Sequence, residues 1–214
     1  MAKVLVTGGA GYIGTTLVPL LLELGHEVVV FDNLVYSGEF LIPYFRKPNF
    51  SFVKGDVRDY EKVAEVCRDK DVIIHLAAIV GYGACRKDER LAHDVNLIGT
   101  ENVVRSLTPE QHLIFASTGS NYGVLKDICT ESSPLNPLSI YGKTKTQAEA
   151  FVRENAPCFT AFRFATAFGV SPRLRLDLLI NELSYMALKQ KYLVVYEPHF
   201  MRTFIHVHDI ARSF

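Results

Sequence analysis

The sequence has no tryptophan, few cysteines and no apolar run of about 20 residues, the length that a membrane-spanning helix needs. Its four cysteines are scattered without a C-x-x-C pair, so we interpret them as reduced packing thiols rather than as metal ligands or disulfides. Lysine plus arginine and aspartate plus glutamate both number 23, and this balance argues against nucleic acid or an anionic membrane surface as a partner. Met1 leads directly into a strand-like run without room for a signal peptide. We therefore expect a soluble cytoplasmic protein without a metal site.

The sequence does contain an alternation of short apolar runs and helix-length segments. Runs that are apolar on both faces are typical of buried parallel strands, which the intervening segments join as helical crossovers. Gly25 follows the first such helix as a C-terminal cap. The pattern predicts an α/β fold with a doubly wound (Rossmann) parallel sheet. The expected strands are residues 4–6, 28–31, 51–53, 72–75, 113–115 and 159–163, and the expected helices are residues 15–24, 61–68, 96–106 and 139–154.

Four glycines crowd into residues 6–14, VTGGAGYIG, between the first expected strand and the first expected helix. Gly8, Gly11 and Gly14 form the pattern G-x-x-G-x-x-G, which allows a tight turn and lets a pyrophosphate approach a helix N-terminus. The segment lacks the G-K-[ST] ending of a P-loop, which disfavours an ATPase. Asp32 ends the second expected strand, where a carboxylate can accept both ribose hydroxyls of an adenosine and would repel a 2′-phosphate. Together these features predict binding of NAD rather than NADP.

A second pattern, Y-x-x-x-K, lies in the segment SIYGKTKTQAEAF. Tyr141 and Lys145 are four residues apart and share one face of the expected helix. A nearby ammonium favours the phenolate, and lowering a tyrosine pKa from ~10 to ~7 takes about 4 kcal/mol, which a charge and the positive ring of a bound cofactor can supply. Such a phenolate could take a proton from a sugar hydroxyl while hydride leaves the same carbon. Alone, the pair would more often be a surface tyrosine beside a solvated lysine, but next to the glycine-rich loop it predicts a catalytic site.

These motifs carry a resemblance: the sequence is similar to the extended short-chain dehydrogenases/reductases of the nucleotide-sugar epimerase/dehydratase family. The matching segments are TGGAGYIG, FDN, GDVRD, HLAA, VNLIGTENV, FASTGSNYG, YGKTK, FRFATAFG and RTFIHVHDIA. The resemblance implies that Thr118 hydrogen-bonds the reacting hydroxyl and that Tyr141 is the base. It implies that Lys145 holds the nicotinamide ribose and tunes Tyr141. The cofactor contacts that it adds to the glycines and Asp32 are Tyr12, Ile13, Asn33, Asp56, Val57, Leu76, Ala77, Ala78, Asn96, Tyr141 and Lys145.

The residues after Thr118 separate the reactions of this family. Relatives that remove water from the sugar place acidic residues there, which protonate and deprotonate it. Here residues 119–122 read GSNY, without a carboxylate, so a dehydratase is not expected. Oxidation at a sugar carbon remains, with C4 favoured: an epimerase then re-reduces the ketone from the other face, and a dehydrogenase releases it. A non-catalytic NAD-binding module is a further alternative, which the intact set of Thr118, Tyr141 and Lys145 disfavours.

The resemblance also implies a nucleotide-diphosphate sugar as the substrate. Guanidinium groups bind diphosphate oxygens through paired hydrogen bonds, and the resemblance places an asparagine and an arginine on the diphosphate. Thr166 stands where many relatives have an asparagine that contacts the substrate. The expected substrate contacts are Thr118, Thr166, Arg173, Asn181 and Arg202.

The domain organisation follows from the same resemblance, because relatives are longer than this sequence. We expect an NAD-binding Rossmann domain at residues 1–168 and a partial, truncated C-terminal substrate domain at residues 169–214. Relatives dimerise through the helices that carry Asn96 and Tyr141, so a homodimer is the expected assembly. His206 and His208 have no third ligand nearby in the sequence, and we expect them in a strand and a loop rather than on a metal.

Overall fold

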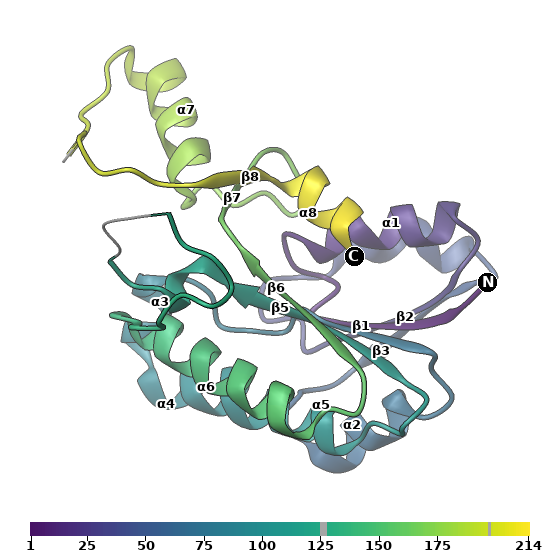
Figure 1. Ribbon diagram of the computed structural model, residues 1–214. Coiled ribbons are helices and arrows are strands. Elements are labelled where there is room, and N and C mark those ends of the chain that lie inside the picture. Colours follow the sequence, from purple (N-terminus) through teal and green to yellow (C-terminus); the bar gives the residue numbers. More distant parts are fainter. Residues whose placement is uncertain (125–127, 197) are drawn as a thin grey trace.

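A six-stranded parallel sheet forms the centre of the molecule in the computed structural model, which describes residues 1–124, 128–196 and 198–214 (Figure 1). The strands lie in the order β3-β2-β1-β4-β5-β6, and all neighbouring strands run parallel. The order reverses between β1 and β4, the place where ligands bind in a doubly wound sheet. The predicted Rossmann fold is confirmed. The strands are β1 (Lys3–Thr7), β2 (Glu27–Asp32), β3 (Phe50–Lys54), β4 (Val72–His75), β5 (His112–Thr118) and β6 (Phe159–Phe164).

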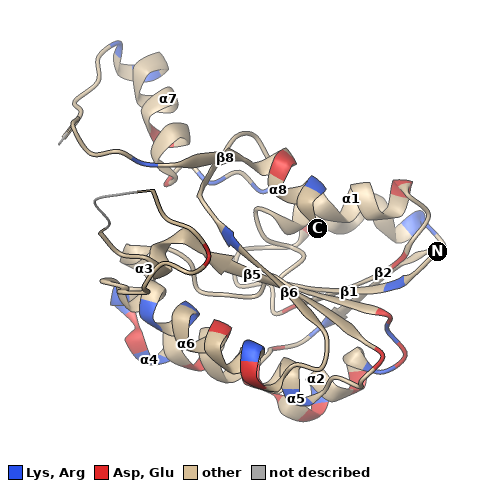
Figure 2. Ribbon diagram, viewed as in Figure 1, with Lys and Arg blue, Asp and Glu red and all other residues tan. Residues whose placement is uncertain are grey.

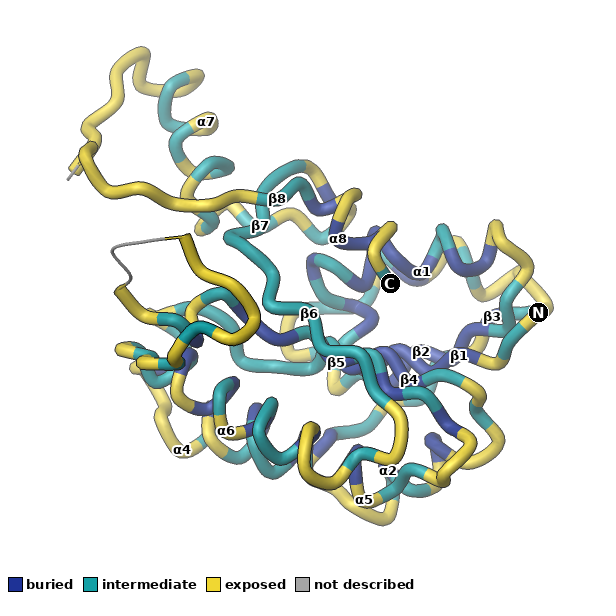
Figure 3. Tube along the Cα trace, in the orientation of Figure 1, coloured by how far each residue is buried: buried dark blue, intermediate teal, exposed yellow. Residues whose placement is uncertain are grey.

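Helices cover both faces of this sheet (Figure 1). On one face, α1 (Gly14–Glu23) packs beside α8 (Val207–Ser213). On the other face, α2 (Tyr60–Cys67), α5 (Gly99–Arg105) and α6 (Ile140–Asn155) pack against one another. Each face has its own buried apolar cluster, and Figure 3 shows burial concentrated in the central strands and the helix sides that face them. The sheet is therefore buried on both sides, as the apolar runs in its strands require.

Capping residues set the ends of the two helices that border the candidate site. Gly25 adopts a left-handed φ of +83° just after α1, as predicted, and its N–H and the next one donate to carbonyls of the last helical turn at 3.2 and 3.0 Å. Ser139 precedes α6, and its hydroxyl accepts a hydrogen bond from the N–H of Gly142 at 3.0 Å. This cap fixes the first turn of α6, which carries Tyr141.

The helix expected at residues 96–106 begins earlier and contains a π turn. The π turn η2 (Asp94–Ile98) joins α4 (Glu89–His93) directly to α5. A π turn adds a residue to the helical repeat, so the apolar side chains before it are out of phase with those after it. For this reason the helical periodicity of the sequence did not predict α4. Such turns are frequent at functional sites, and Asn96 lies at the centre of this one. Three other short helices were not predicted: η1 (Glu39–Arg46), α3 (Tyr82–Lys87) and η3 (Gly119–Asn121).

The C-terminal segment forms a smaller unit beside the sheet. β7 (Thr166–Phe168) pairs in parallel with β8 (Phe204–His206), and α7 (Leu179–Gln190) lies between them in the chain. Figure 1 shows α7 standing away from the main sheet, and none of its residues is buried (Figure 3). The expected boundary after residue 168 falls at the end of β7. From β8 the chain returns to the main sheet as α8.

The structure corrects two interpretations of the sequence. His206 lies in a strand, but His208 lies in α8 rather than in a loop, because the ring of His206 accepts a hydrogen bond from the His208 N–H at 3.3 Å and caps that helix. The packing role expected for the cysteines holds for two of them, which are buried, and fails for the two that are exposed. The buried pair is Cys67 and Cys85, and the exposed pair is Cys129 and Cys158.

Figure 2 shows that Lys or Arg residues and Asp or Glu residues both occur along each of α2, α4, α5 and α6, in keeping with the balanced composition. Among the helices that the structure describes, none has both the length and the apolar character needed to cross a membrane.

Candidate active site

The turn between β1 and α1 is packed so closely that it excludes side chains. Gly8 has a left-handed φ of +70°, and a Cβ built on it would lie 2.7 Å from the backbone nitrogen of Ala77. A Cβ on Gly14 would lie 2.5 Å from the Cα of Gly9, and one on Gly11 would lie 3.1 Å from the carbonyl oxygen of Gly8. The glycine pattern is thus required sterically, because the turn meets the loop after β4 on one side and folds on itself on the other.

The start of α1 offers free hydrogen-bond donors beside this turn. Within the described parts of the chain, the backbone N–H groups of Tyr12, Ile13 and Gly14 donate to no acceptor. Free N–H groups and the helix dipole at an N-terminus favour an anion, so these donors fit the pyrophosphate of a dinucleotide. The Tyr12 ring is buried and its hydroxyl donates to the carbonyl of Gly169 at 2.7 Å. Tyr12 therefore offers its backbone to a ligand, not its ring.

Asp32 lies at the carboxyl end of β2, next to the same turn. Its Oδ2 accepts from the N–H of Ala10 at 3.0 Å, and its Oδ1 accepts from the N–H of Leu34 at 2.8 Å. Burial raises the pKa of Asp32, and these hydrogen bonds oppose the rise. Each carboxylate oxygen keeps a further lone pair, which the ribose hydroxyls of an adenosine can use. The free lone pairs of the Asp32 carboxylate therefore fit the adenosine ribose of NAD.

Asn33 and Asp56, both expected near the adenosine, contact each other. The Nδ2 of Asn33 donates to Oδ2 of Asp56 at 3.1 Å, and the guanidinium of Arg58 binds the same carboxylate at 2.8 and 2.9 Å. These hydrogen bonds, chiefly those from Arg58, lower the pKa of Asp56 to about 2. The side chain of Val57 is buried in the core, and its carbonyl accepts from Asn102 Nδ2 at 3.0 Å. At this end of the site, Val57 therefore has only backbone to offer an adenine.

A directional chain of hydrogen bonds supports the loop after β4. The Thr100 hydroxyl donates to the carbonyl of Asn96 at 2.7 Å, so it accepts from Nε2 of His75 at 3.1 Å. Burial, followed by the nearby lysine charge, lowers the pKa of His75 to about 3, so the ring is neutral and its Nδ1 accepts from the Thr7 hydroxyl at 2.6 Å. The Thr7 oxygen accepts in turn from the N–H of Ala77 at 3.3 Å. This series of hydrogen bonds holds the loop that contains the expected cofactor contacts Leu76, Ala77 and Ala78.

Asn96 holds the same loop from the π turn. Its Oδ1 accepts from the N–H of Ile79 at 2.7 Å, and its Nδ2 donates to the Ile79 carbonyl at 3.0 Å and to the Thr144 hydroxyl at 3.2 Å. Asn96 is fully buried. Its amide thus connects the loop to α6 from behind, which matches a supporting place in the site.

The three expected catalytic residues meet where β5 ends and α6 begins. Thr118 is the last residue of β5, and its Oγ1 accepts from the N–H of Ser120 at 3.1 Å. The phenol of Tyr141, in the first turn of α6, lies close enough to the Thr118 side chain for that side chain to affect its pKa. One turn later, Lys145 is 2% exposed, and its Nζ lies 3.9 Å from the centroid of the Phe115 ring. The arrangement places a hydroxyl, a phenol and an amine in one small volume.

The predicted lowering of the Tyr141 pKa relies on Lys145 together with the positive ring of a bound cofactor. In the chain alone, burial raises that pKa to about 12 and outweighs the opposing effects of the Thr118 side chain and the positive charge of Arg175. Burial also lowers the pKa of Lys145 to about 7, against the charge of Glu149, so the lysine is only partly ionised at neutral pH. A phenolate at Tyr141 therefore needs further positive charge in the site, such as an oxidised nicotinamide ring.

Four residues after Lys145, Glu149 forms an ion pair with Arg163 that sequence reasoning missed. Arg163 Nε donates to Glu149 at 2.9 Å, the Ser117 hydroxyl donates to the same carboxylate, and Asn121 Nδ2 donates to it at 3.0 Å. Burial would raise the pKa of Glu149, but the hydrogen bonds from Arg163 and Ser117 lower it. Since Ser117 and Asn121 flank Thr118, the ion pair fixes the turn that presents the Thr118 hydroxyl. Its sequence signal was the repeated four-residue spacing along α6.

Arg175 reaches the site from the segment between β7 and α7. Its Nη2 lies 3.6 Å from a Cβ built on Gly81, and its Nε donates to Asp177 at 3.1 Å. The side chain is 15% exposed, and its charge acts on the phenol of Tyr141. Arg175 is therefore a cation whose charge acts on Tyr141, and it was absent from the expected site residues.

The expected substrate contacts occupy separate places. The Oδ1 of Asn181 accepts a hydrogen bond from the N–H of Gly169 at 2.9 Å, and its Nδ2 donates to the carbonyl of Arg175 at 2.9 Å. The Asn181 amide is therefore engaged within the loop after β7. Thr166 begins β7, and Arg202 is exposed just before β8, the strand that pairs with β7. Arg173 lies apart from these residues, with its guanidinium carbon 4.2 Å from the centroid of the Tyr36 ring.

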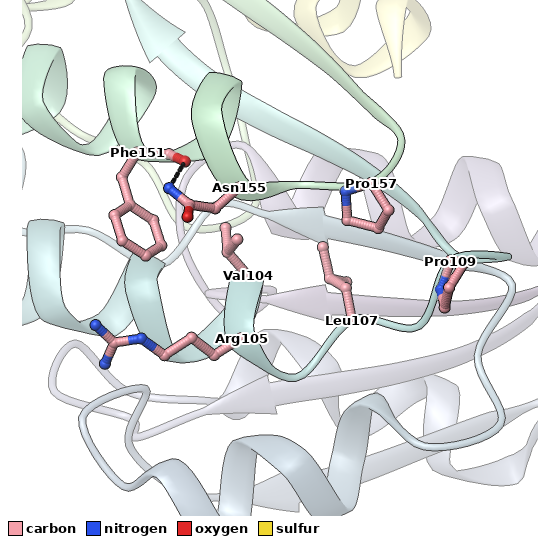
Figure 4. A pocket seen from close by; sticks show the side chains of 7 residues that line it. All are labelled: Val104, Arg105, Leu107, Pro109, Phe151, Asn155 and Pro157. Carbon is pink, nitrogen blue, oxygen red and sulfur yellow. Dashed lines mark hydrogen bonds between the residues drawn. The ribbon is translucent and has the colours of Figure 1, made fainter.

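An open hollow of about 500 Å³ lies at the other end of α5 and α6 (Figure 4). Val104 and Phe151 line it, the guanidinium of Arg105 lies 5.5 Å from the Phe151 ring, and Asn155 Nδ2 donates to the Phe151 carbonyl at 2.9 Å. Phe151 is ten residues beyond Tyr141, about 15 Å along the helix. The hollow is therefore not part of the candidate active site.

Comparison with known proteins identifies the family. The family model described as "NAD dependent epimerase/dehydratase family" matches residues 4–214. UDP-glucose 4-epimerase 1 from Oryza sativa subsp. japonica is 36% identical over 165 residues, which are 72% of this chain and 47% of that protein. Protein CapI from Staphylococcus aureus is 30% identical over 227 residues, 99% of this chain and 67% of that protein. The chain thus spans about half the length of the first of these relatives.

Solved structures agree with this result. UDP-glucuronic acid 4-epimerase from Bacillus cereus, in complex with UDP-glucuronic acid and NAD, has a TM-score of 0.87 and 27% identity over 99% of this chain and 71% of its own. dTDP-glucose 4,6-dehydratase from Bacillus anthracis, in complex with NAD, has a TM-score of 0.84 and 29% identity over 100% of this chain and 70% of its own. The expectation of NAD as the cofactor agrees with the family. The chain belongs to the NAD dependent epimerase/dehydratase family, as the resemblance of its motifs implied.

Proposed function

We propose that this chain carries the cofactor-binding and proton-transfer groups of an NAD-dependent nucleotide-sugar epimerase that acts at a sugar carbon, with C4 favoured. The observation that carries the proposal is the meeting of Thr118, Tyr141 and Lys145 beside a glycine turn whose free N–H groups fit a pyrophosphate. The relatives named UDP-glucose 4-epimerase and UDP-glucuronic acid 4-epimerase support the same class of substrate, a nucleotide-diphosphate sugar.

In this mechanism, the Tyr141 phenolate removes the proton from the reacting sugar hydroxyl, and the Thr118 hydroxyl hydrogen-bonds the same sugar oxygen and orients it. NAD, when bound, accepts the hydride from the carbon and brings positive charge near the phenol. Lys145 holds the nicotinamide ribose, and its ammonium stabilises the phenolate together with Arg175. In an epimerase, Tyr141 would return the proton to the same oxygen once the carbon is reduced again from its opposite face. A dehydrogenase would release the ketone before that step.

The turn after Thr118 favours epimerisation or simple oxidation over loss of water. Neighbouring structures include dehydratases as well as epimerases, so the shared fold does not separate the reactions. The residues of η3, which follow Thr118 directly, are glycine, serine and asparagine, and they supply no carboxylate to protonate a leaving hydroxyl.

Thr166 and Arg202 belong to the proposal as substrate-side residues. Asn181, whose amide holds the loop after β7, is proposed to lie on the same side of the site. The expected homodimer also remains a proposal, with α5 and α6 as its helices. We also propose that the protein is soluble and located in the cytoplasm.

The first experiment is to unfold the purified protein and identify the released small molecules by mass spectrometry. An epimerase keeps its cofactor through oxidation and reduction, so we expect NAD near one per chain. The protein is then supplied with UDP-glucose and with UDP-glucuronic acid, and the products are separated. Release of a keto sugar with consumption of added NAD would show a dehydrogenase instead. Bound NAD without conversion of any nucleotide sugar tested would favour the non-catalytic module.

A further inference from the structure

We propose that Arg173 and Tyr36 form the outer wall of the adenosine-ribose site, and that Arg173 is the residue through which Asp32 sets the preference for NAD over NADP. This places Arg173 at the cofactor and not at the substrate diphosphate. The inference rests on the proposed binding of NAD at the glycine turn, but not on the reaction that follows.

The first observation is the stacking of Arg173 on Tyr36. The guanidinium carbon of Arg173 lies 4.2 Å from the centroid of the Tyr36 ring, within the range of a cation–π contact. Tyr36 is four residues beyond Asp32 in the loop that leaves β2, and its ring is half exposed. The pair therefore joins the loop after β2 to a segment that lies more than a hundred residues later in the chain.

The second observation is that the segment carrying Arg173 is anchored to the glycine turn. The Ser171 hydroxyl donates to the carbonyl of Tyr12 at 2.7 Å and lies 2.9 Å from the Thr15 hydroxyl. The Arg173 N–H lies 3.4 Å from the same Thr15 oxygen. Ser171 and Thr15 are buried, so these contacts are shielded from water. The guanidinium is thus presented from a fixed backbone, and its place beside the ribose end is a property of the fold.

The third observation is electrostatic. The carboxylate of Asp32 is partly desolvated, and the positive charge of Arg173 helps to keep its pKa from rising further. The charges of Asp32 and Arg173 therefore act on each other at the end of β2. When Asp32 is ionised, its negative charge compensates the positive charge of Arg173, and the carboxylate repels a 2′-phosphate.

Removing the Asp32 charge leaves Arg173 as an uncompensated cation at the same place. A guanidinium presents paired donors that match phosphate oxygens, so Arg173 would then bind the 2′-phosphate of NADP. Any gain in NADP binding on neutralising Asp32 is expected to depend on Arg173. If the gain depends on Arg173, then Arg173 binds the 2′-phosphate. If it does not, the gain comes only from the lost repulsion between Asp32 and the phosphate.

The test is a double-mutant cycle on the whole chain, with dissociation constants for NAD and NADP measured by calorimetry in the absence of sugar. We expect Asp32→Asn to improve NADP binding relative to NAD by about tenfold or more, the scale of a hydrogen bond to a charged group. Arg173→Met in the Asp32→Asn background is expected to remove this gain, and Arg173→Lys to retain part of it. The matched control is Arg90→Met, whose side chain is 92% exposed on α4.

An Asp32→Asn, Arg173→Met protein that binds NADP as tightly as Asp32→Asn would overturn the inference. Tyr36→Leu keeps the arginine charge and removes its stacking partner, and unchanged cofactor selectivity in the Asp32→Asn, Tyr36→Leu protein would remove Tyr36 from it. Circular dichroism confirms that each variant is folded. Failure of the unmodified chain to bind NAD would instead contradict the proposed function, so the two failures are distinguishable.

Discussion

The Nζ of Lys145 lies 3.9 Å from the centroid of the Phe115 ring on β5. The charge of Glu149 on α6 acts on this ammonium, and the ammonium acts on His75 of β4. Because Lys145 is 2% exposed, it exchanges most of the water that would solvate an ammonium for these protein groups. This exchange is unfavourable for the charge, and the pKa of Lys145 falls to about 7. The site therefore contains a lysine whose charge depends on what binds above it.

Lys145→Met is expected to stabilise the folded chain at pH 6 by about 1–4 kcal/mol, the range found when buried charges are replaced by apolar residues. The pKa of Lys145 is about 7 in the folded chain and 10.5 without burial, so the unfolded chain binds more protons between these values. The cost of burying the ammonium is therefore full below pH 7 and disappears as the pH rises toward 10.5.

Urea unfolding at pH 6 and at pH 9.5 checks this prediction. The advantage of Lys145→Met should be largest at pH 6 and should shrink at pH 9.5. Lys143→Met, at an exposed position on the same helix, should change little at either pH. A variant less stable than the unmodified chain at pH 6 would contradict the burial cost.

Tyr141→Phe is expected to abolish turnover of a nucleotide sugar while leaving the dissociation constant for NAD within about threefold of its value, since one hydroxyl that is not required for cofactor binding is lost. Rates are measured in single turnover with saturating NAD. Tyr60→Phe, an exposed tyrosine at the start of α2, serves as the control and should keep full activity. Activity that survives in Tyr141→Phe would remove the phenol from the mechanism.

His75→Gln is expected to make the chain less sensitive to acid. The pKa of His75 is about 3 in the folded chain, against 6.5 without burial, so the unfolded chain binds an extra proton between these values. Stability that is present above pH 6.5 is then lost as the pH falls toward 3, by up to about 1.4 kcal/mol per pH unit. A glutamine amide keeps one donor and one acceptor for Thr100 and Thr7 but takes up no proton.

The free energy of unfolding at pH 6, 5 and 4 for both proteins provides the measurement. The difference between His75→Gln and the unmodified chain should move in favour of the variant at each step toward acid. A constant difference across these pH values would mean that the pKa of His75 is the same in the folded and the unfolded chain.

The fold and the centre of the site were predictable because they follow from local patterns. Apolar runs and glycine spacing identify β1 and α1, and the Y-x-x-x-K spacing was placed on the expected helix that became α6, without knowledge of the rest of the chain. The turn of Gly8 and the face shared by Tyr141 and Lys145 depend only on such short-range geometry. The structure has a strand-to-helix turn at Gly8 and a helix that carries Tyr141 and Lys145, as these local patterns predicted.

The parts that the sequence did not predict are those that depend on partners distant in the chain. Glu149 meets Arg163 only because β6 joins the sheet beside β5. Arg175 reaches the tyrosine because the loop after β7 folds back over the glycine turn. The rise that burial causes in the pKa of Tyr141 was not predicted, because the helical spacing reveals a neighbouring charge but not the loss of water.

Gly8→Ala and Gly25→Ala separate the two reasons for which a glycine is needed. Both residues have a positive φ, +70° and +83°, so each substitution costs about 1–2 kcal/mol for a left-handed backbone alone. A Cβ at Gly25 has no atom within 4 Å, whereas one at Gly8 would lie 2.7 Å from the backbone of Ala77, which cannot move without disturbing β4. Gly8→Ala should therefore lose clearly more stability than Gly25→Ala and should also weaken NAD binding, and Gly25→Ala should leave binding unchanged. Denaturant unfolding and calorimetric titration with NAD measure the two effects. Equal losses of stability would mean that the turn can open around an added methyl group, and the close approach of Gly8 to Ala77 would then not be what positions the free N–H groups of α1.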